Sequence, residues 1–97
     1  MSKLFVCLVD YLADISEVES VRVEHREYLG EFYKKGVLLV SGPRNPLNGG
    51  LIIGKFENMN EAREFSKNDP FVKKNIAEYR IFEFETVMFD NCLRNFL

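Results

Sequence analysis

The sequence predicts an α+β fold in which the elements follow the order strand, helix, strand, strand, helix, strand. Three observations carry this prediction: four short stretches are rich in β-branched and aromatic residues, two stretches have apolar residues at helical spacing, and turn residues separate them. The length of 97 residues is that of one domain. We therefore expect a single domain over residues 1–97, with a core at about residues 3–86 and a C-terminal tail at residues 87–97.

The first strand and the first helix account for the chain up to Gly36. Residues 4–9, LFVCLV, form an apolar run of strand-forming residues, which Asp10 and Tyr11 close. A helix of roughly 16 to 18 residues is expected next, ending at Gly36, because glycine after basic residues is typical of helix C-termini. The apolar positions at helical spacing are Val18, Val21, Tyr28, Leu29, Phe32 and Tyr33.

The middle of the chain predicts an antiparallel β-hairpin. VLLVSGP at residues 37–43 and LIIGKFE at residues 51–57 are the two strands. RNPLNGG at residues 44–50 is rich in turn residues and is expected to join them.

The last third of the chain predicts a second helix, a helical turn and a final strand. Asn60 is expected to cap a helix over residues 61–68, EAREFSKN. Asp69 and Pro70 then suit the start of a fresh helical turn, DPFVKKN, because proline is tolerated at the first helical position and aspartate is favoured before it. The fourth strand is EYRIFEFET at residues 78–86.

This order, βαββαβ, is that of a ferredoxin-like fold, in which an antiparallel sheet carries two helices on one face. The first three strands are apolar on both faces, whereas the helices can cover only one face. We therefore expect a second copy of the chain to cover the other face, which makes the protein a homodimer.

Composition argues against several partners. The net charge is −2, from 13 basic and 15 acidic residues without a basic run, so neither nucleic acid nor an anionic membrane surface is an expected partner. No stretch approaches the roughly 18 apolar residues of a membrane span, and no secretion signal is visible at the N-terminus. Cys7 and Cys92 lie far apart, and with one histidine in the chain no metal site is expected. Free thiols fit a reducing compartment, so we expect a cytoplasmic protein.

Several separated pieces of the sequence resemble the YCII-related family. They are H..YL at residues 25–29, G.LL.SGP at 36–43, the glycines at 49 and 50, EA..F at 61–65, NDPF at 68–71 and the closing strand at 79–84. Together they cover about residues 3–85. The resemblance implies the dimeric α/β-barrel version of the ferredoxin-like fold. It also implies a cleft beside the SGP strand end, in which the family's histidine and aspartate correspond to His25 and Asp69.

His25 and Asp69 each have a structural interpretation beside the catalytic one. His25 belongs to the inward stripe of the first helix, where most single histidines are core residues whose ring nitrogens are hydrogen-bonded. Asp69 is explained by capping alone, although one of its oxygens can cap while the other accepts a hydrogen bond from His25. A carboxylate at that place would fix the tautomer of the imidazole and prepare it for proton transfer.

Ser41, Gly42 and Pro43 end a strand, where a hydroxyl and free N–H groups can bind a substrate oxygen, but the same residues also suit a simple turn. Arg44, directly after them, is a candidate for binding an anionic substrate, as is Arg22, three residues before His25; both can equally be surface residues.

The leading hypothesis is a cofactor-free enzyme in which His25 is general acid or base and Asp69 orients it. The resemblance implies isomerisation or elimination, including dehydrochlorination, on a small polar or aromatic-derived molecule. The alternative is a non-catalytic dimeric module that binds a small ligand or a partner protein. A cofactor-free oxygenase acting on a quinol-type substrate is a third possibility.

Overall fold

The computed structural model describes residues 2–97. The elements are β1 (Lys3–Tyr11), α1 (Ile15–Lys34), β2 (Leu38–Pro43), β3 (Gly49–Gly54), α2 (Met59–Lys67), α3 (Pro70–Lys73) and β4 (Ala77–Glu85), followed by a 3₁₀ turn at Asn91–Leu93. This is the predicted order, with the expected helical turn after Asp69 present as α3.

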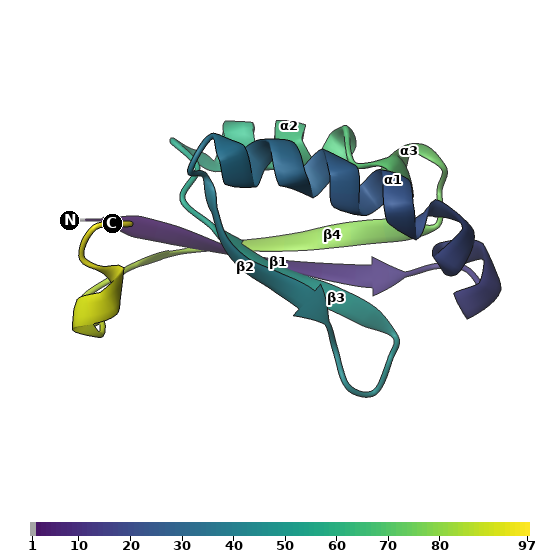
Figure 1. Cartoon of the computed structure of the whole chain (residues 1–97), viewed down its shortest axis with the longest axis horizontal. Helices are drawn as coiled ribbons and strands as arrows, with labels where there is room; N and C mark the ends of the chain where they lie inside the picture. Colours follow the sequence, from purple (N-terminus) through teal and green to yellow (C-terminus); the bar gives the residue numbers. More distant parts are fainter. Residues whose placement is uncertain (1) are drawn as a thin grey trace.

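The four strands form one antiparallel sheet in the order β2-β3-β1-β4. The helices lie together over one face of this sheet, and the opposite face carries none of them (Figure 1). The architecture is therefore the predicted ferredoxin-like α+β fold, and β2 and β3 pair as the expected hairpin. The core lies between the sheet and the helices.

Strand β1 supplies the centre of that core. Phe5, Cys7 and Val9 alternate along β1 and are at most 2% exposed, so they share the face that packs against the helices. Ile52, the partner of Cys7 on β3, extends this buried layer, and Val18 of α1 closes it from above.

Helix α1 is longer than expected, with 20 residues, because it begins at Ile15, before the first buried position of its apolar stripe. It ends as predicted at Gly36, which has a φ of +74°. The Gly36 N–H donates to Tyr33 O at 3.0 Å, and the Val37 N–H donates to Phe32 O at 2.9 Å. These two bonds form a Schellman motif, which glycine favours because it has no Cβ to crowd the left-handed conformation.

The expected cap of α2 is wrong by two residues: Asn58, not Asn60, caps this helix. The Asn58 side chain accepts from the Glu61 N–H at 2.9 Å, and the Glu61 carboxylate accepts from the Glu57 N–H at 3.2 Å. A capping residue with glutamate three positions later stabilises a helix start reciprocally, and that spacing selects Asn58.

The expected turn is also too long, because Gly49 and Gly50 belong to β3. A Cβ on Gly49 would lie 2.0 Å from Val9 O and 2.6 Å from the Arg44 side chain. Only glycine permits this close approach of β3 to β1. Strand β3 therefore begins at Gly49, two residues before its predicted start.

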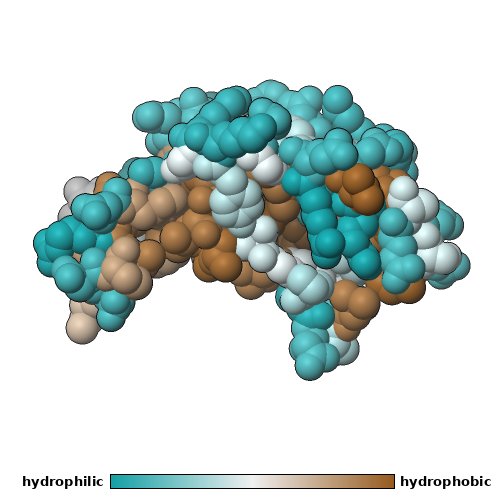
Figure 2. Space-filling view, in the orientation of Figure 1, coloured by the Kyte–Doolittle hydropathy of each residue, from teal (hydrophilic) through white to brown (hydrophobic). Residues whose placement is uncertain are grey.

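The uncovered face of the sheet is apolar. Val40, Ile53, Val6 and Phe82 are paired in one row across all four strands, on the face opposite the core. Val40 and Phe82 are 50% and 54% exposed. In Figure 2 this face forms a hollow, hydrophobic underside between the hairpin and the C-terminal tail.

The C-terminal tail packs at the far end of β1 from the hairpin turn (Figure 1). The Thr86 N–H donates to Ser2 O at 2.9 Å, and Lys55 donates to Phe96 O while its ammonium lies 4.6 Å from the centre of the Phe96 ring. In residues 2–97, no helix is long and apolar enough to cross a membrane.

Candidate functional site

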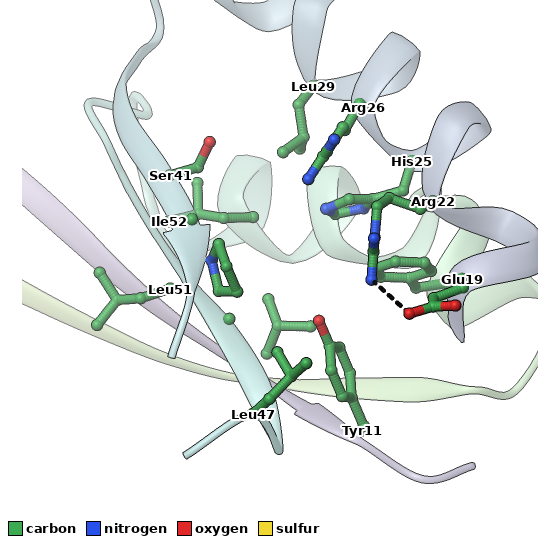
Figure 3. Close-up of a pocket in the computed structure, with 15 residues that line it drawn as sticks. Tyr11, Glu19, Arg22, His25, Arg26, Leu29, Ser41, Leu47, Leu51 and Ile52 are labelled. Atoms are coloured by element: carbon green, nitrogen blue, oxygen red, sulfur yellow. Dashed lines mark ion pairs between the residues drawn. The ribbon is translucent and has the colours of Figure 1, made fainter. Parts of the chain in front are cut away.

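A cavity of about 550 Å³ opens between α1 and the end of the β2–β3 hairpin (Figure 3). Its size lies within the range of roughly 300–1,000 Å³ that is typical of small-molecule sites. The floor is formed by β1 and β3, with Val9, Tyr11 and Ile52 among the lining residues, and Phe71 of α3 closes the inner end.

Helix α1 presents two neighbouring stripes of side chains. Val18 and Val21 face the core and are at most 6% exposed. Glu19, Arg22 and Arg26 recur at helical spacing beside them and line the cavity. His25 continues the stripe that faces the core, but it lies next to the stripe of charged residues. It therefore lines the cavity, although its side chain is only 13% exposed.

The imidazole of His25 is fixed by two contacts. Its ring stacks on Phe71, with ring centres 4.0 Å apart and planes 9° from parallel. Its Nδ1 lies 2.8 Å from Oδ1 of Asp69. An ionised carboxylate only accepts hydrogen bonds, so beside an ionised Asp69 the hydrogen belongs on Nδ1 and the lone pair of a neutral imidazole on Nε2.

Asp69 caps α3 and contacts His25, but through the same oxygen, not through one oxygen each as expected. It is completely buried and caps α3, with Oδ1 accepting from the Phe71 N–H at 2.9 Å as well as from His25. Pro70 at the first helical position fixes the backbone at this point. The cap thus holds the carboxylate in the orientation that meets the imidazole.

Tyr79 of β4 completes the surroundings of this carboxylate. Its hydroxyl donates to Oδ2 of Asp69 at 2.5 Å. Burial raises the pKa of Tyr79 strongly, and the adjacent Asp69 carboxylate raises that pKa further. The hydroxyl therefore stays protonated, and both oxygens of Asp69 are held by donors.

Ser41, Gly42 and Pro43 lie on the opposite wall of the cavity from α1. The Ser41 hydroxyl lies 2.7 Å from the hydroxyl of Tyr33, which holds it in place. The structure therefore brings the SGP strand end and His25 to one cavity.

Arg44 and Arg22, the two arginine candidates, have different places. Arg44 does not line the cavity: its guanidinium donates to Val9 O at 2.9 Å and Gly50 O at 2.8 Å, and it forms an ion pair with Asp10 at 3.0 Å. These contacts tie the hairpin to β1 and occupy the Arg44 guanidinium with partners inside the fold, outside the cavity. Arg22 lines the cavity and pairs with Glu19 at 3.7 Å (Figure 3).

Sequence reasoning missed Arg26 and Tyr79. The signal for Arg26 was its spacing from Glu19 and Arg22, seven and four residues before it, which defines a second stripe on α1. The signal for Tyr79 was the alternation of β4, which places it on the helix-facing side of the sheet.

The two cysteines lie outside the cavity and form no disulfide with each other. Burial raises the pKa of Cys7 to about 12, so its thiol stays protonated. In the described part of the chain, no three His, Cys, Asp or Glu side chains are grouped as metal ligands.

The fold and the cavity define a small ferredoxin-like α+β protein with a histidine–aspartate pair in a cleft between its first helix and its hairpin. The chain belongs to the YCII-related family, whose domain matches residues 3–85. It is similar in structure to 5-chloro-2-hydroxyhydroquinone dehydrochlorinase from Burkholderia phenoliruptrix AC1100, solved in complex with 2,5-dihydroxybenzoquinone. The TM-score is 0.73 at 22% identity, and the match covers 84% of this chain and 93% of the dehydrochlorinase chain. No curated protein matches the chain by sequence.

Proposed function

We propose that this protein is an enzyme that moves a proton on a small ring compound, using the pair of His25 and Asp69 and no cofactor. The observation that carries the proposal is the 2.8 Å contact between His25 Nδ1 and a buried carboxylate, at the wall of a cavity of ligand size. The reaction is an isomerisation or an elimination of the dehydrochlorination type.

The proposed chemistry begins at Nε2 of His25. Its lone pair removes a proton from a carbon or oxygen that a neighbouring carbonyl has made acidic. The imidazolium that forms is stabilised by Asp69, whose position is fixed by the N–H of Phe71 and the hydroxyl of Tyr79. In an isomerisation Nε2 returns the proton to another atom of the substrate, and in an elimination the leaving group departs with its bonding electrons.

Ser41 and the strand end that follows it are proposed to bind the substrate. The Ser41 hydroxyl lies on the β2 side of the cavity and is oriented by Tyr33, which stands in the last turn of α1. A substrate oxygen held there places the ring between this wall and the imidazole. The similarity to a dehydrochlorinase that binds 2,5-dihydroxybenzoquinone supports a ring compound as substrate.

The proposal is tested by turnover of 5-chloro-2-hydroxyhydroquinone and a panel of small cyclic ketones and lactones, followed as chloride release or proton exchange in D₂O. His25→Ala should lower the rate by about 100-fold to 10,000-fold, the usual contribution of a general acid or base. Asp69→Asn should lower it less, and Arg63→Gln, at an exposed position of α2, is the control that should not change it.

Full turnover by His25→Ala would remove the proposed role of the pair. Ligand binding without turnover, with affinity retained in His25→Gln, would instead favour the binding module, because that variant keeps a hydrogen-bonding side chain of similar length.

The open sheet face supports the further proposal that two copies of the chain pack face to face. The row formed by Val40, Ile53, Val6 and Phe82 is apolar, and a second identical sheet offers a surface of the same kind.

The proposed compartment is the cytoplasm. The structure has two free thiols, Cys7 and Cys92, which suit a reducing compartment.

A further inference from the structure

The charged groups of the cavity all come from one wall, that of α1. Of its lining residues only Glu19, Arg22 and Arg26 carry a permanent charge, and all three are on α1. The rest of the lining is mostly apolar or uncharged, with Ile52 and Phe71 facing the same space. The cavity thus has an apolar floor and a charged upper wall.

The two arginines differ in their partners. Arg22 is paired with Glu19 at 3.7 Å, so its charge is partly offset within the wall. Among residues 2–97, no side chain or backbone oxygen accepts a hydrogen bond from Arg26 or forms an ion pair with it. In Figure 3 the Arg26 side chain extends from α1 toward the cavity beside His25.

Asp69, the acidic residue behind His25, has all its neighbouring donors within the fold. Asp69 is completely buried behind His25, and its oxygens accept from His25, Phe71 and Tyr79. The cavity lining therefore has one more cationic than acidic side chain, counting Arg22 and Arg26 against Glu19. An anion in the cavity would supply the missing counter-charge.

We propose that the substrate is a ring compound bearing an ionised oxygen acid, a carboxylate, phenolate or enolate, and that Arg26 binds this acid group. The guanidinium presents paired N–H donors in one plane, which match two oxygens or one charged oxygen better than an ammonium does. The apolar floor takes the ring, and His25, the neighbour of Arg26 on α1, is left to face the atom that gains or loses the proton. This assignment rests on the proposed function for the reaction, but the binding of an anion at Arg26 stands without it.

The test is binding of three probes, followed by NMR titration of the backbone amides. The probes are 2,5-dihydroxybenzoquinone, which is acidic, and the pair benzoate and benzamide, which have the same shape but differ in charge. Wild-type protein should bind benzoate about tenfold more tightly than benzamide, because a hydrogen bond between two charged groups is stronger than one to a neutral amide.

Three variants assign that preference to one side chain. Arg26→Gln should weaken binding of both anions by about tenfold and leave benzamide unchanged, while Arg26→Lys should recover part of the loss. Arg63→Gln on α2 removes the same charge from the chain outside the cavity and should change nothing, which controls for the overall field of the protein.

Equal affinity for benzoate and benzamide, equal effects of Arg26→Gln and Arg63→Gln, or no shifts at cavity residues would overturn the inference. These results separate it from the proposed reaction. An Arg26-dependent anion site in a protein whose turnover ignores His25 would sustain the inference and remove the reaction, whereas His25-dependent turnover without charge preference would do the reverse.

Discussion

At the scale of single residues, the site is a chain of three polar side chains from three elements. Tyr79 of β4 donates to Asp69 at the start of α3, which accepts from His25 of α1. Each carboxylate oxygen has a donor, and Asp69 is completely buried. The position of His25 therefore depends on a tyrosine that does not line the cavity.

Replacing Tyr79 by phenylalanine should test that dependence. Tyr79→Phe leaves Oδ2 of the buried Asp69 without its donor, which should cost about 1–3 kcal/mol of unfolding free energy in urea denaturation. Tyr33→Phe is the matched control: it removes the hydroxyl that contacts Ser41 on an exposed tyrosine and should cost less. Equal losses in the two variants would mean that the contact with Asp69 is not special.

Local patterns predicted that His25 lies on the inward stripe of the first helix and that Asp69 caps the turn after it, whereas their approach to each other was expected only from the family resemblance. Their catalytic role stays a prediction. The place of Arg44 was not predictable, since its partners Val9 and Gly50 come from strands whose register no local pattern gives. Tyr79 was missed because its partner, Asp69, lies on a different element, and no local pattern shows that the two meet.

At the scale of elements, Asp10 ties three strands together. Its carboxylate accepts from Arg80 of β4 at 2.7 Å and from Arg44, next to β2, at 3.0 Å. The Arg80 guanidinium, and to a lesser extent that of Arg44, holds the pKa of Asp10 below its usual range.

The order of elements was predictable from periodicity. The start of β3 was not, because it depends on the close approach of Gly49 to Val9.

The arrangement around Asp10 predicts how stability depends on pH. A carboxyl whose pKa is lower in the folded than in the unfolded chain stabilises the fold above its unfolded pKa, about 3.9, and loses that contribution as the pH falls through the folded value. The difference in unfolding free energy between wild type and Asp10→Asn should therefore be largest near neutral pH and shrink below about pH 4. Urea denaturation across this range measures it; a constant difference would show that the charge of Asp10 does not contribute.

At the scale of the whole molecule, the two faces of the sheet are unequal. One is covered by α1, α2 and α3, and the other is an apolar hollow (Figures 1 and 2). The sequence predicted this imbalance from the strands alone, since they are apolar at successive positions. The shape of the hollow depends on the tail after Thr86, whose apolar residues have no clear period and whose packing against Lys55 was not predictable.

The proposed face-to-face dimer predicts the effect of one charge. Wild-type protein should have the mass of a dimer by light scattering, and Phe82→Lys should yield folded monomers because it buries an unpaired charge in the interface. Val23→Lys, on an exposed position of α1, is the control and should remain dimeric. A monomeric wild type, or a Phe82→Lys dimer, would contradict this assembly.

The most direct test of the central claim is the tautomer of His25, read from the ¹⁵N chemical shifts of its ring at alkaline pH, where imidazole is neutral. His25 is the only histidine, so the signals need no assignment. The account predicts that Nδ1 carries the hydrogen and Nε2 the lone pair in wild type, and that Asp69→Asn shifts this balance. A wild-type imidazole with its hydrogen on Nε2, unchanged in Asp69→Asn, would contradict the account, because that nitrogen could not accept a proton from a substrate.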